Sequence, residues 1–199
     1  MGGFGGVDGL CTWIVDNAVD VVVDATHPFA ATMSANAARA APKAGVPLVV
    51  LRRPEWTPDI GDRWLHASSA ADAARIVESS FERVFLTIGR QEVGAFAGAT
   101  GTWFLVRCID PPEGPLPAHH ELVSARGPFD VASEMATMHR HRIDVLVSKN
   151  SGGAMTEAKL IAARRLEVPV VMISRPAPTE HGVLAHSVED VWRSLVDRM

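Results

Sequence analysis

Apolar runs of strand length alternate with alanine-rich segments of helical period along most of the chain. Residues 20–24 and 46–51 are predicted strands, and residues 29–41 between them form a predicted helix, which completes one βαβ unit. Such alternation is typical of parallel sheets that are covered by helices. The pattern therefore predicts an α/β fold built from Rossmann-like parallel sheets.

A segment rich in proline interrupts this pattern at residues 54–62, where two prolines and a Gly-Asp turn disfavour both helix and strand. Beyond this linker the alternation predicts helices at residues 69–79, 91–96, 128–140, 154–166 and 188–196, and strands at residues 83–88, 102–109, 144–148 and 168–173. We therefore expect two α/β domains with a ligand cleft between them. The N-terminal domain covers residues 1–66 and the C-terminal domain residues 67–199.

Composition and charge narrow the class of protein. The chain has 199 residues, 47% of them hydrophobic, which is enough to bury a core. Its net charge of −4 argues against a general nucleic-acid binder, because phosphate binding needs a basic face. No apolar run approaches the roughly 20 residues that span a bilayer, so we expect no membrane partner. The N-terminus has no secretory signal, and this makes the cytoplasm the expected location.

The cysteines and histidines do not form a metal motif. Cys11 and Cys108 lack the spacing of a zinc site or of a disulfide framework. The histidines do not follow a metal-ligand spacing either. The sequence therefore predicts no metal.

The first predicted strand ends in polar residues. Asp24, Thr26 and His27 place a carboxylate, a hydroxyl and an imidazole on one turn between strand and helix. In doubly wound sheets ligands bind beyond the carboxyl ends of the strands, so these side chains are candidates for a binding or catalytic site. The alternative is structural, with Thr26 or Asp24 capping the helix and His27 an ordinary loop histidine.

The predicted strand at residues 144–148 runs into a turn that contains glycines and leads directly into a helix. The residues of this turn are Ser148, Lys149, Asn150, Ser151, Gly152 and Gly153. Glycines let the backbone approach a phosphate, and the lysine provides a countercharge. The sequence matches neither a P-loop nor the GxGxxG fingerprint. The turn is a candidate anion site, and an ordinary capped turn is the alternative.

Arginines follow several other predicted strands. Gly89 permits a tight bend, and Arg90 begins the next short helix, where its planar guanidinium suits a phosphate or a carboxylate. The alternative for Arg90 is a solvated ion pair with Glu92. Further arginines at strand ends or in loops are Arg52, Arg53, Arg107, Arg126 and Arg175. On an acidic chain they indicate a positive edge that attracts a polyanionic ligand.

Six motifs extend across essentially the whole chain. They are Asp24-Ala-Thr-His-Pro-Phe-Ala30, Arg53-Pro-Glu-Trp56, Leu86-Thr-Ile-Gly-Arg90, Arg107-Cys-Ile-Asp-Pro-Pro112, Arg126-Gly-Pro-Phe129 and Ser148-Lys-Asn-Ser-Gly-Gly153. In this order they resemble the precorrin-6A reductase family of cobalamin biosynthesis, called cobalt-precorrin-6A reductase in the anaerobic route. The resemblance implies a two-domain α/β oxidoreductase. Such an enzyme uses NADPH to reduce one carbon-carbon double bond of the precorrin-6A macrocycle and gives precorrin-6B.

The resemblance also implies roles for the motif residues. Because the macrocycle carries many carboxylates, the expected substrate ligands are Arg52, Arg53, Arg107 and Arg126. The expected cofactor ligands are Asp24, Thr26, Gly89, Arg90, Ser148, Lys149, Asn150, Ser151, Gly152 and Gly153. Hydride transfer must be matched by a proton, for which His27 is the first candidate donor and Lys149 the second.

One departure from the family concerns the N-terminus. Members begin with a strand and a turn of the form Gly-Gly-Thr-x-Glu, whereas this chain opens on Gly2-Gly3-Phe4-Gly5-Gly6 followed by a helical pattern. We therefore expect a truncated N-terminal domain. The alternatives are an incomplete form of the reductase, or a non-catalytic two-lobed protein that binds a nucleotide or a tetrapyrrole. Other enzymes of the cobalamin pathway are possible partners, and the sequence leaves open whether the macrocycle carries cobalt.

Overall fold

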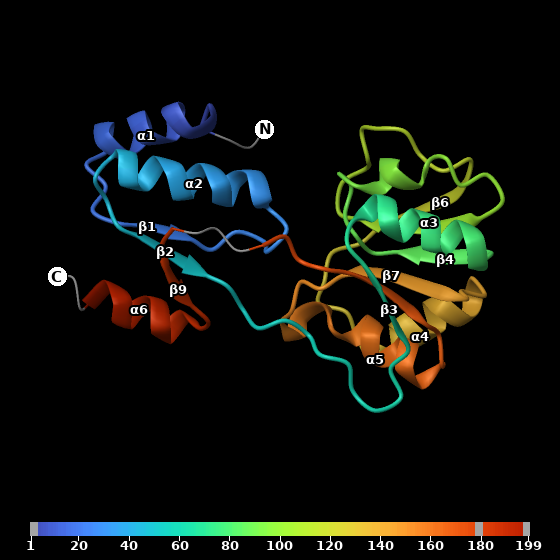
Figure 1. Ribbon diagram of the computed structural model, residues 1–199. Helices are drawn as coiled ribbons and strands as arrows, with labels where there is room; N and C mark the ends of the chain where they lie inside the picture. The colour runs from blue at the N-terminus through green and yellow to red at the C-terminus, as the bar shows by residue number, and fades with distance from the viewer. Residues whose placement is uncertain (1–3, 178–180, 197–199) are drawn as a thin grey trace. The chain divides into compact units, whose positions relative to one another are not determined.

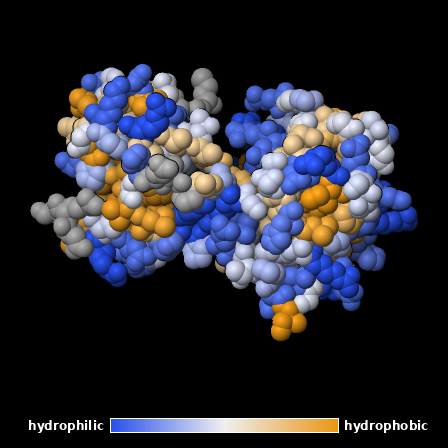
Figure 2. Space-filling view, viewed as in Figure 1, coloured by the Kyte–Doolittle hydropathy of each residue, from blue (hydrophilic) through white to orange (hydrophobic). Residues whose placement is uncertain are grey.

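The computed structural model describes residues 4–177 and 181–196. It divides into two compact α/β units (Figure 1). The first unit comprises Met1–Pro54 and Pro176–Met199, and the second comprises Glu55–Arg175. On the face shown in Figure 2, apolar side chains form small patches separated by hydrophilic ones in both units. Within the described ranges no helix is long and apolar enough to cross a membrane.

The first unit is a three-layered α/β structure around a small parallel sheet. Its strands are β1 (Val22–Asp24), β2 (Leu48–Leu51) and β9 (Val183–Ala185), in the order β1-β2-β9. Helices α1 (Gly6–Asp16) and α2 (Ala31–Lys43) cover one face, and α6 (Val188–Val196) covers the other (Figure 1). Successive residues of a strand point to opposite faces. Leu48 accordingly packs with α1 and α2, whereas Val49 packs with Val191 of α6.

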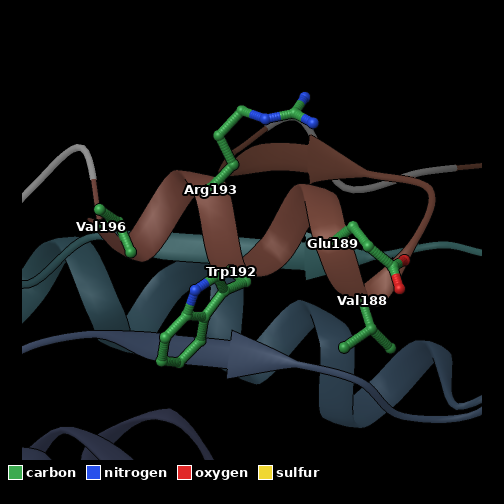
Figure 3. A pocket seen from close by; sticks show the side chains of 5 residues that line it. All are labelled: Val188, Glu189, Trp192, Arg193 and Val196. Carbon is green, nitrogen blue, oxygen red and sulfur yellow. The ribbon is translucent and has the colours of Figure 1, made fainter.

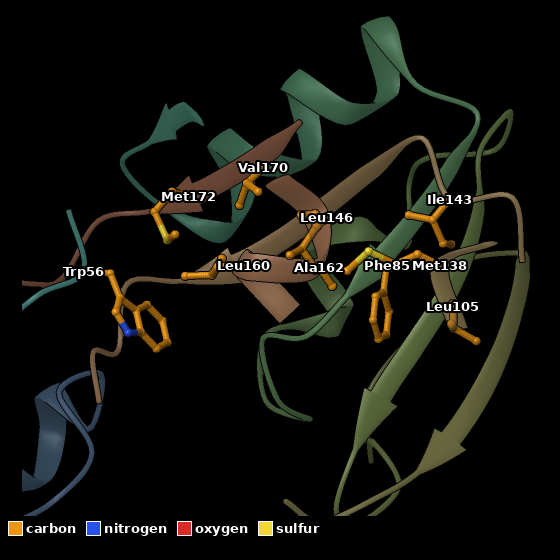
Figure 4. Packing of buried hydrophobic residues seen from close by; sticks show 11 residues of the cluster. Trp56, Phe85, Leu105, Met138, Ile143, Leu146, Leu160, Ala162, Val170 and Met172 are labelled. Atoms are coloured by element: carbon orange, nitrogen blue, oxygen red, sulfur yellow. The ribbon is translucent and has the colours of Figure 1, made fainter. Parts of the chain in front are cut away.

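The second unit holds a parallel sheet of six strands in the order β3-β8-β7-β4-β5-β6. The strands are β3 (Trp64–Ala67), β4 (Arg83–Leu86), β5 (Trp103–Cys108), β6 (His119–Ser124), β7 (Val145–Lys149) and β8 (Val170–Ile173). The helices are α3 (Ala70–Ser80), α4 (Val131–Arg140) and α5 (Ala158–Arg165), with short 3-10 turns η1 (Val93–Phe96) and η2 (Ala154–Thr156). Phe85 and Leu146 of the sheet pack with Met138 of α4 and Leu160 of α5 in the main core (Figure 4).

The α/β fold and the parallel sheets predicted from the sequence are confirmed, and most predicted strands and helices are present. Three strands were missed, β3, β6 and β9, and each lies at an edge of its sheet. An edge strand is buried less than a central one and so lacks a continuous apolar run. β6, for instance, consists of exposed and half-buried residues and has no buried one. The predicted helix at residues 154–166 is a 3-10 turn followed by α5.

The division into units differs from the expected boundary after residue 66. A boundary there would cut through β3, which pairs with β8 along its whole length. The first unit instead consists of two segments of the chain, one that ends at Pro54 and one that starts at Pro176. The second segment belongs to this unit because its strand β9 pairs with β2. Pairing between strands about 130 residues apart leaves no local signal in the sequence.

Candidate active site

The carboxyl ends of three parallel strands surround a hollow in the first unit. Its volume is about 440 Å³, within the range of about 300 to 1,000 Å³ that is usual for small-molecule sites. The lining residues are Ala25, Thr26, His27, Pro28, Leu51, Arg53, His186, Ser187 and Val188. They lie at or just after the ends of β1, β2 and β9 and at the start of α6. We call this cavity the strand-end hollow.

The turn after β1 is organised by a buried carboxylate. Asp24 is 5% exposed. Its Oδ1 accepts hydrogen bonds from the backbone N–H of Thr26 at 3.0 Å and from the Thr26 hydroxyl at 2.6 Å. The Thr26 hydroxyl also lies 3.3 Å from that of Ser34 on α2. The residue that caps α2 is Ala30, which provides no side-chain cap, so neither Asp24 nor Thr26 has the capping role considered as the alternative. Asp24 and Thr26 instead fix the turn that carries His27.

Two histidines line the hollow, and Nδ1 accepts a hydrogen bond in His27 but donates one in His186. The backbone N–H of Phe29 donates to Nδ1 of His27 at 3.3 Å. Nδ1 of His186 lies 3.0 Å from the backbone carbonyl oxygen of Arg52. His186 was missed by sequence reasoning because it follows β9, a strand that was not predicted. The polar pair His186-Ser187 after the short apolar run at residues 183–185 was the available signal.

The two arginines after β2 have different surroundings. Arg53 is exposed and lines the hollow. Arg52 is half-buried and donates from its guanidinium to the carbonyl oxygen of Pro176 at 2.9 Å, while its backbone N–H continues the sheet by bonding to Ala185. Arg53 is therefore placed to meet a ligand in the hollow, and Arg52 secures the returning C-terminal segment.

A larger depression of about 590 Å³ lies on α6 (Figure 3). It is lined by residues of that helix alone: Val188, Glu189, Trp192, Arg193 and Val196. Val188 and Trp192 point to one side of the helix and Arg193 to the other (Figure 3). Because no strand end contributes, this depression lacks the convergent polar groups of a binding site.

In the second unit, two of the predicted turns lie side by side, because β4 and β7 are neighbours in the sheet. The turn at residues 148–153 contains Gly152 and Gly153 with φ of 66° and 84°, and the other contains Gly89 with φ of 80°. Glycine tolerates these left-handed conformations without strain. Nζ of Lys149 lies 2.7 Å from Oε2 of Glu92 and so joins the two turns by an ion pair.

Arg90 does not form the ion pair with Glu92 that was considered for it. Its guanidinium lies 3.3 Å from Oε1 of Glu113, and both side chains are largely exposed. Arg90 also lines a hollow of about 280 Å³ together with Gln91 and residues 112–115. The guanidinium is thus at the surface of a small cavity beyond β4.

Ser148 and Asn150 are buried within the second unit. Asn150 accepts from the backbone N–H of Trp56 at 2.9 Å and donates to its carbonyl oxygen at 3.0 Å. Nε of Arg175 donates to the Asn150 carbonyl oxygen at 2.6 Å. Ser148 is fully buried. These two side chains hold the fold around the turn, so its backbone and Lys149 are the parts suited to an anion.

Arg107 is the centre of a buried charged cluster. Its guanidinium forms an ion pair with Glu134, whose side chain is 2% exposed, and it lies 3.9 Å and 4.8 Å from the rings of Phe129 and Phe85. Lys159 is also buried, and burial, reinforced by the charge of Arg107, lowers its pKa to about 8. Sequence reasoning missed Glu134 and Lys159, because charged residues on a helix normally face solvent.

Arg126 lies in the loop that leads to Phe129, and it is exposed. The contact between Arg107 and Phe129 therefore anchors the loop that carries Arg126. Among the described residues, no group of three or more His, Cys, Asp or Glu side chains is arranged to hold a metal ion.

Two parallel-sheet units with polar residues at their strand ends, and glycine turns in the second unit, are typical of a Rossmann-like α/β enzyme. The family model described as precorrin-6x reductase CbiJ/CobK matches residues 1–195, and the chain belongs to this family of oxidoreductases. The resemblance stated from the sequence is thereby confirmed.

Individual relatives agree with this assignment. Precorrin-6A reductase of Rhodococcus erythropolis is 58% identical over 176 residues, which cover 88% of this chain and 71% of the relative. That of Rhodobacter capsulatus is 46% identical, covering 99% of this chain and 78% of the relative. Cobalt-precorrin-6A reductase of Salmonella typhimurium is 31% identical, covering 87% and 69%. A solved structure of CobK precorrin-6A reductase superposes with a TM-score of 0.93 at 45% identity, covering 98% of this chain and 80% of that one.

Proposed function

We propose that this chain reduces one carbon-carbon double bond of precorrin-6A, giving precorrin-6B, with NADPH as the hydride source, in the cytoplasm. The observation that carries the proposal is similarity over almost the entire chain to proteins named precorrin-6A reductase, at up to 58% identity. Two features of the described residues support it: polar strand ends in both units, and an arginine at the strand-end hollow.

The residues at the strand ends fit a dinucleotide. Gly152 and Gly153 adopt positive φ and have no Cβ, so a phosphate can approach their backbone closely, and Lys149 provides the opposite charge. When bound, NADPH supplies the hydride. The residues that would hold it in the second unit are Gly89, Arg90, Lys149, Ser151, Gly152 and Gly153. In the first unit, Asp24 and Thr26 fix the turn that carries His27. Ser148 and Asn150 are buried and hold the turn at residues 148–153 in place.

Arginines provide the chemistry that an acidic macrocycle requires. A planar guanidinium binds a carboxylate through two parallel hydrogen bonds. Arg53 at the hollow and the exposed Arg126 are the arginines best placed for substrate carboxylates. Arg107 already has Glu134 as its partner and acts on the substrate through the loop of Arg126, and Arg52 acts through the segment that begins at Pro176.

The reduction also needs a proton at the carbon next to the one that receives the hydride. His27 lines the hollow and was the first candidate donor, with Lys149 the second. Lys149 forms an ion pair with Glu92, which favours an electrostatic role for it.

The test is anaerobic oxidation of NADPH by the purified chain when precorrin-6A is added, with NADH in a parallel reaction. We expect oxidation of NADPH in preference to NADH, together with a product that is heavier by two hydrogen atoms. The matched control is His119→Gln, an exposed residue on β6 outside both groups of strand-end residues, which should act as fast as wild type. A folded protein that retains NADPH without oxidising it would contradict the proposal and favour the binding protein considered as the alternative.

A further inference from the structure

The strand-end hollow contains a histidine that sequence reasoning missed, and its hydrogen bonds differ from those of His27. We infer that His186 is the catalytic proton donor of the reduction and that His27 is a hydrogen-bonding residue only. The inference rests on the proposed reductase function. It follows from which ring nitrogen of each histidine carries a hydrogen.

His27 is held in a state that cannot release a proton. Its Nδ1 accepts the backbone N–H of Phe29, so this nitrogen carries no hydrogen, and the neutral ring has its hydrogen on Nε2. Loss of that hydrogen would leave an imidazolate anion, which histidine does not form near neutral pH. While the bond to Phe29 lasts, His27 is able to donate a hydrogen bond through Nε2 but not to transfer a proton.

His186 is held in the opposite state. A carbonyl oxygen only accepts, so Nδ1 of His186 must carry the hydrogen that bonds to Arg52. This bond is the same whether Nε2 is protonated or not. Nε2 is therefore able to gain and lose a proton without a rotation of the ring. A carbonyl that orients an imidazole in this way is the usual arrangement for a histidine that acts through its other nitrogen.

The charged groups around His186 come from each element beside the hollow. Asp190 of α6 accepts the backbone N–H of His186 at 3.3 Å, and hydrogen bonds from Ser187 and His186 hold the pKa of its carboxyl below the usual range. Asp190 is thus a carboxylate at neutral pH, and Arg53 after β2 carries the opposite charge. Among the described residues, the other charged or titratable groups that line this hollow or the smaller pocket sharing His27 with it are Asp24 and His27 after β1 and Arg52 after β2. Glu189 and Arg193 on α6 line the separate depression on that helix.

The double bond of the substrate receives a hydride from NADPH at one carbon, and its electron pair moves to the neighbouring carbon. That carbon takes the proton from Nε2 of His186. The products are the reduced macrocycle, NADP⁺ and a neutral imidazole, which solvent can reprotonate because His186 is exposed.

Variants of the two histidines separate their roles. We expect His186→Gln to lower kcat by about 100-fold or more, the usual contribution of a general acid, with small changes in KM for NADPH and precorrin-6A. Added imidazole should restore part of the activity of His186→Ala. The decline of kcat at alkaline pH, caused by loss of the imidazolium, should disappear in His186→Gln. His27→Gln should lose less activity and keep that decline, and His119→Gln should match wild type.

Nitrogen-15 NMR of the histidine rings tests the inference without turnover. At alkaline pH we expect His186 as the Nδ1–H form and His27 as the Nε2–H form, each assigned by the signal that its Gln variant removes. Reversed forms, or a folded His186→Gln with wild-type kcat, would overturn the inference while leaving the reductase function intact. Absence of NADPH oxidation by wild type would overturn both.

Discussion

The strand ends of the two units are chemically different. In the first unit, the polar side chains beyond β1, β2 and β9 line an open hollow, and His186 and Arg53 are exposed. In the second unit, charged and polar groups are largely engaged with one another, as in the buried pair of Arg107 with Glu134. On the function proposed above, we expect the first unit to provide the reacting side chains and the second to provide the turn backbone and the exposed cations Arg90 and Arg126 on a rigid frame.

The largest effect is expected from breaking the buried ion pair of the second unit. Glu134→Leu leaves the guanidinium of Arg107 buried without its partner, next to a second cation at Lys159. Such a loss destabilises a protein by about 3 to 5 kcal/mol. We expect a decrease of this size in the free energy of unfolding, measured by denaturant titration.

Two controls accompany this prediction. The double variant Arg107→Met with Glu134→Leu should recover much of the lost stability, because no buried charge remains without a partner. Glu167→Gln removes the exposed pair with Arg63 and should have little effect. An unfolding free energy of Glu134→Leu equal to that of wild type would mean that the second unit is not held by this pair.

The next effect concerns Lys159 and depends on pH. Burial lowers its pKa from 10.5 to about 8 in the folded protein, so between these pH values the unfolded state binds a proton that the folded state does not. Stability then increases as pH rises through this window, by about 3 kcal/mol at most. Below pH 8 the charged lysine is a cost, and Lys159→Met should be more stable than wild type.

The measurement is the difference in unfolding free energy between wild type and Lys159→Met over pH 7 to 11. This difference should shrink as pH rises and should level off above the pKa of the unfolded lysine. A difference that is constant with pH would show that the ammonium is solvated in the folded protein. Lys159→Arg, which stays charged throughout, is the matched comparison.

Central elements of both sheets were predictable, because strands buried on both faces are continuous apolar runs. The strands β3, β6 and β9 were not predicted because they lie at sheet edges and lack a long apolar run, whereas the edge strand β1 has such a run at residues 21–23. The return of the chain to the first unit was missed together with β9. Site residues were likewise predicted only where the strand before them was predicted. Asp24 and His27 were found after a predicted strand, whereas His186 follows β9.

The sequence also did not show which hydrogen bonds and ion pairs the candidate side chains form. Asn150 and Arg107 were expected as ligands on the basis of residue type, but their partners, Trp56 and Glu134, are distant in sequence. Residue type shows what a side chain is able to bind, and only the fold shows what already occupies it.

The smallest effect on stability is expected at the turn after β1, where a loss of activity would exceed the loss of stability. Thr26→Ala removes one hydrogen bond to Asp24, worth about 1 kcal/mol. Because that turn carries His27 into the hollow, we expect the loss in kcat/KM to exceed the tenfold that 1.4 kcal/mol represents. Thr26→Ser keeps the hydroxyl and should restore both quantities. If Thr26→Ala instead lost stability and kept its kcat/KM, the first unit would have the same structural role at its strand ends as the second.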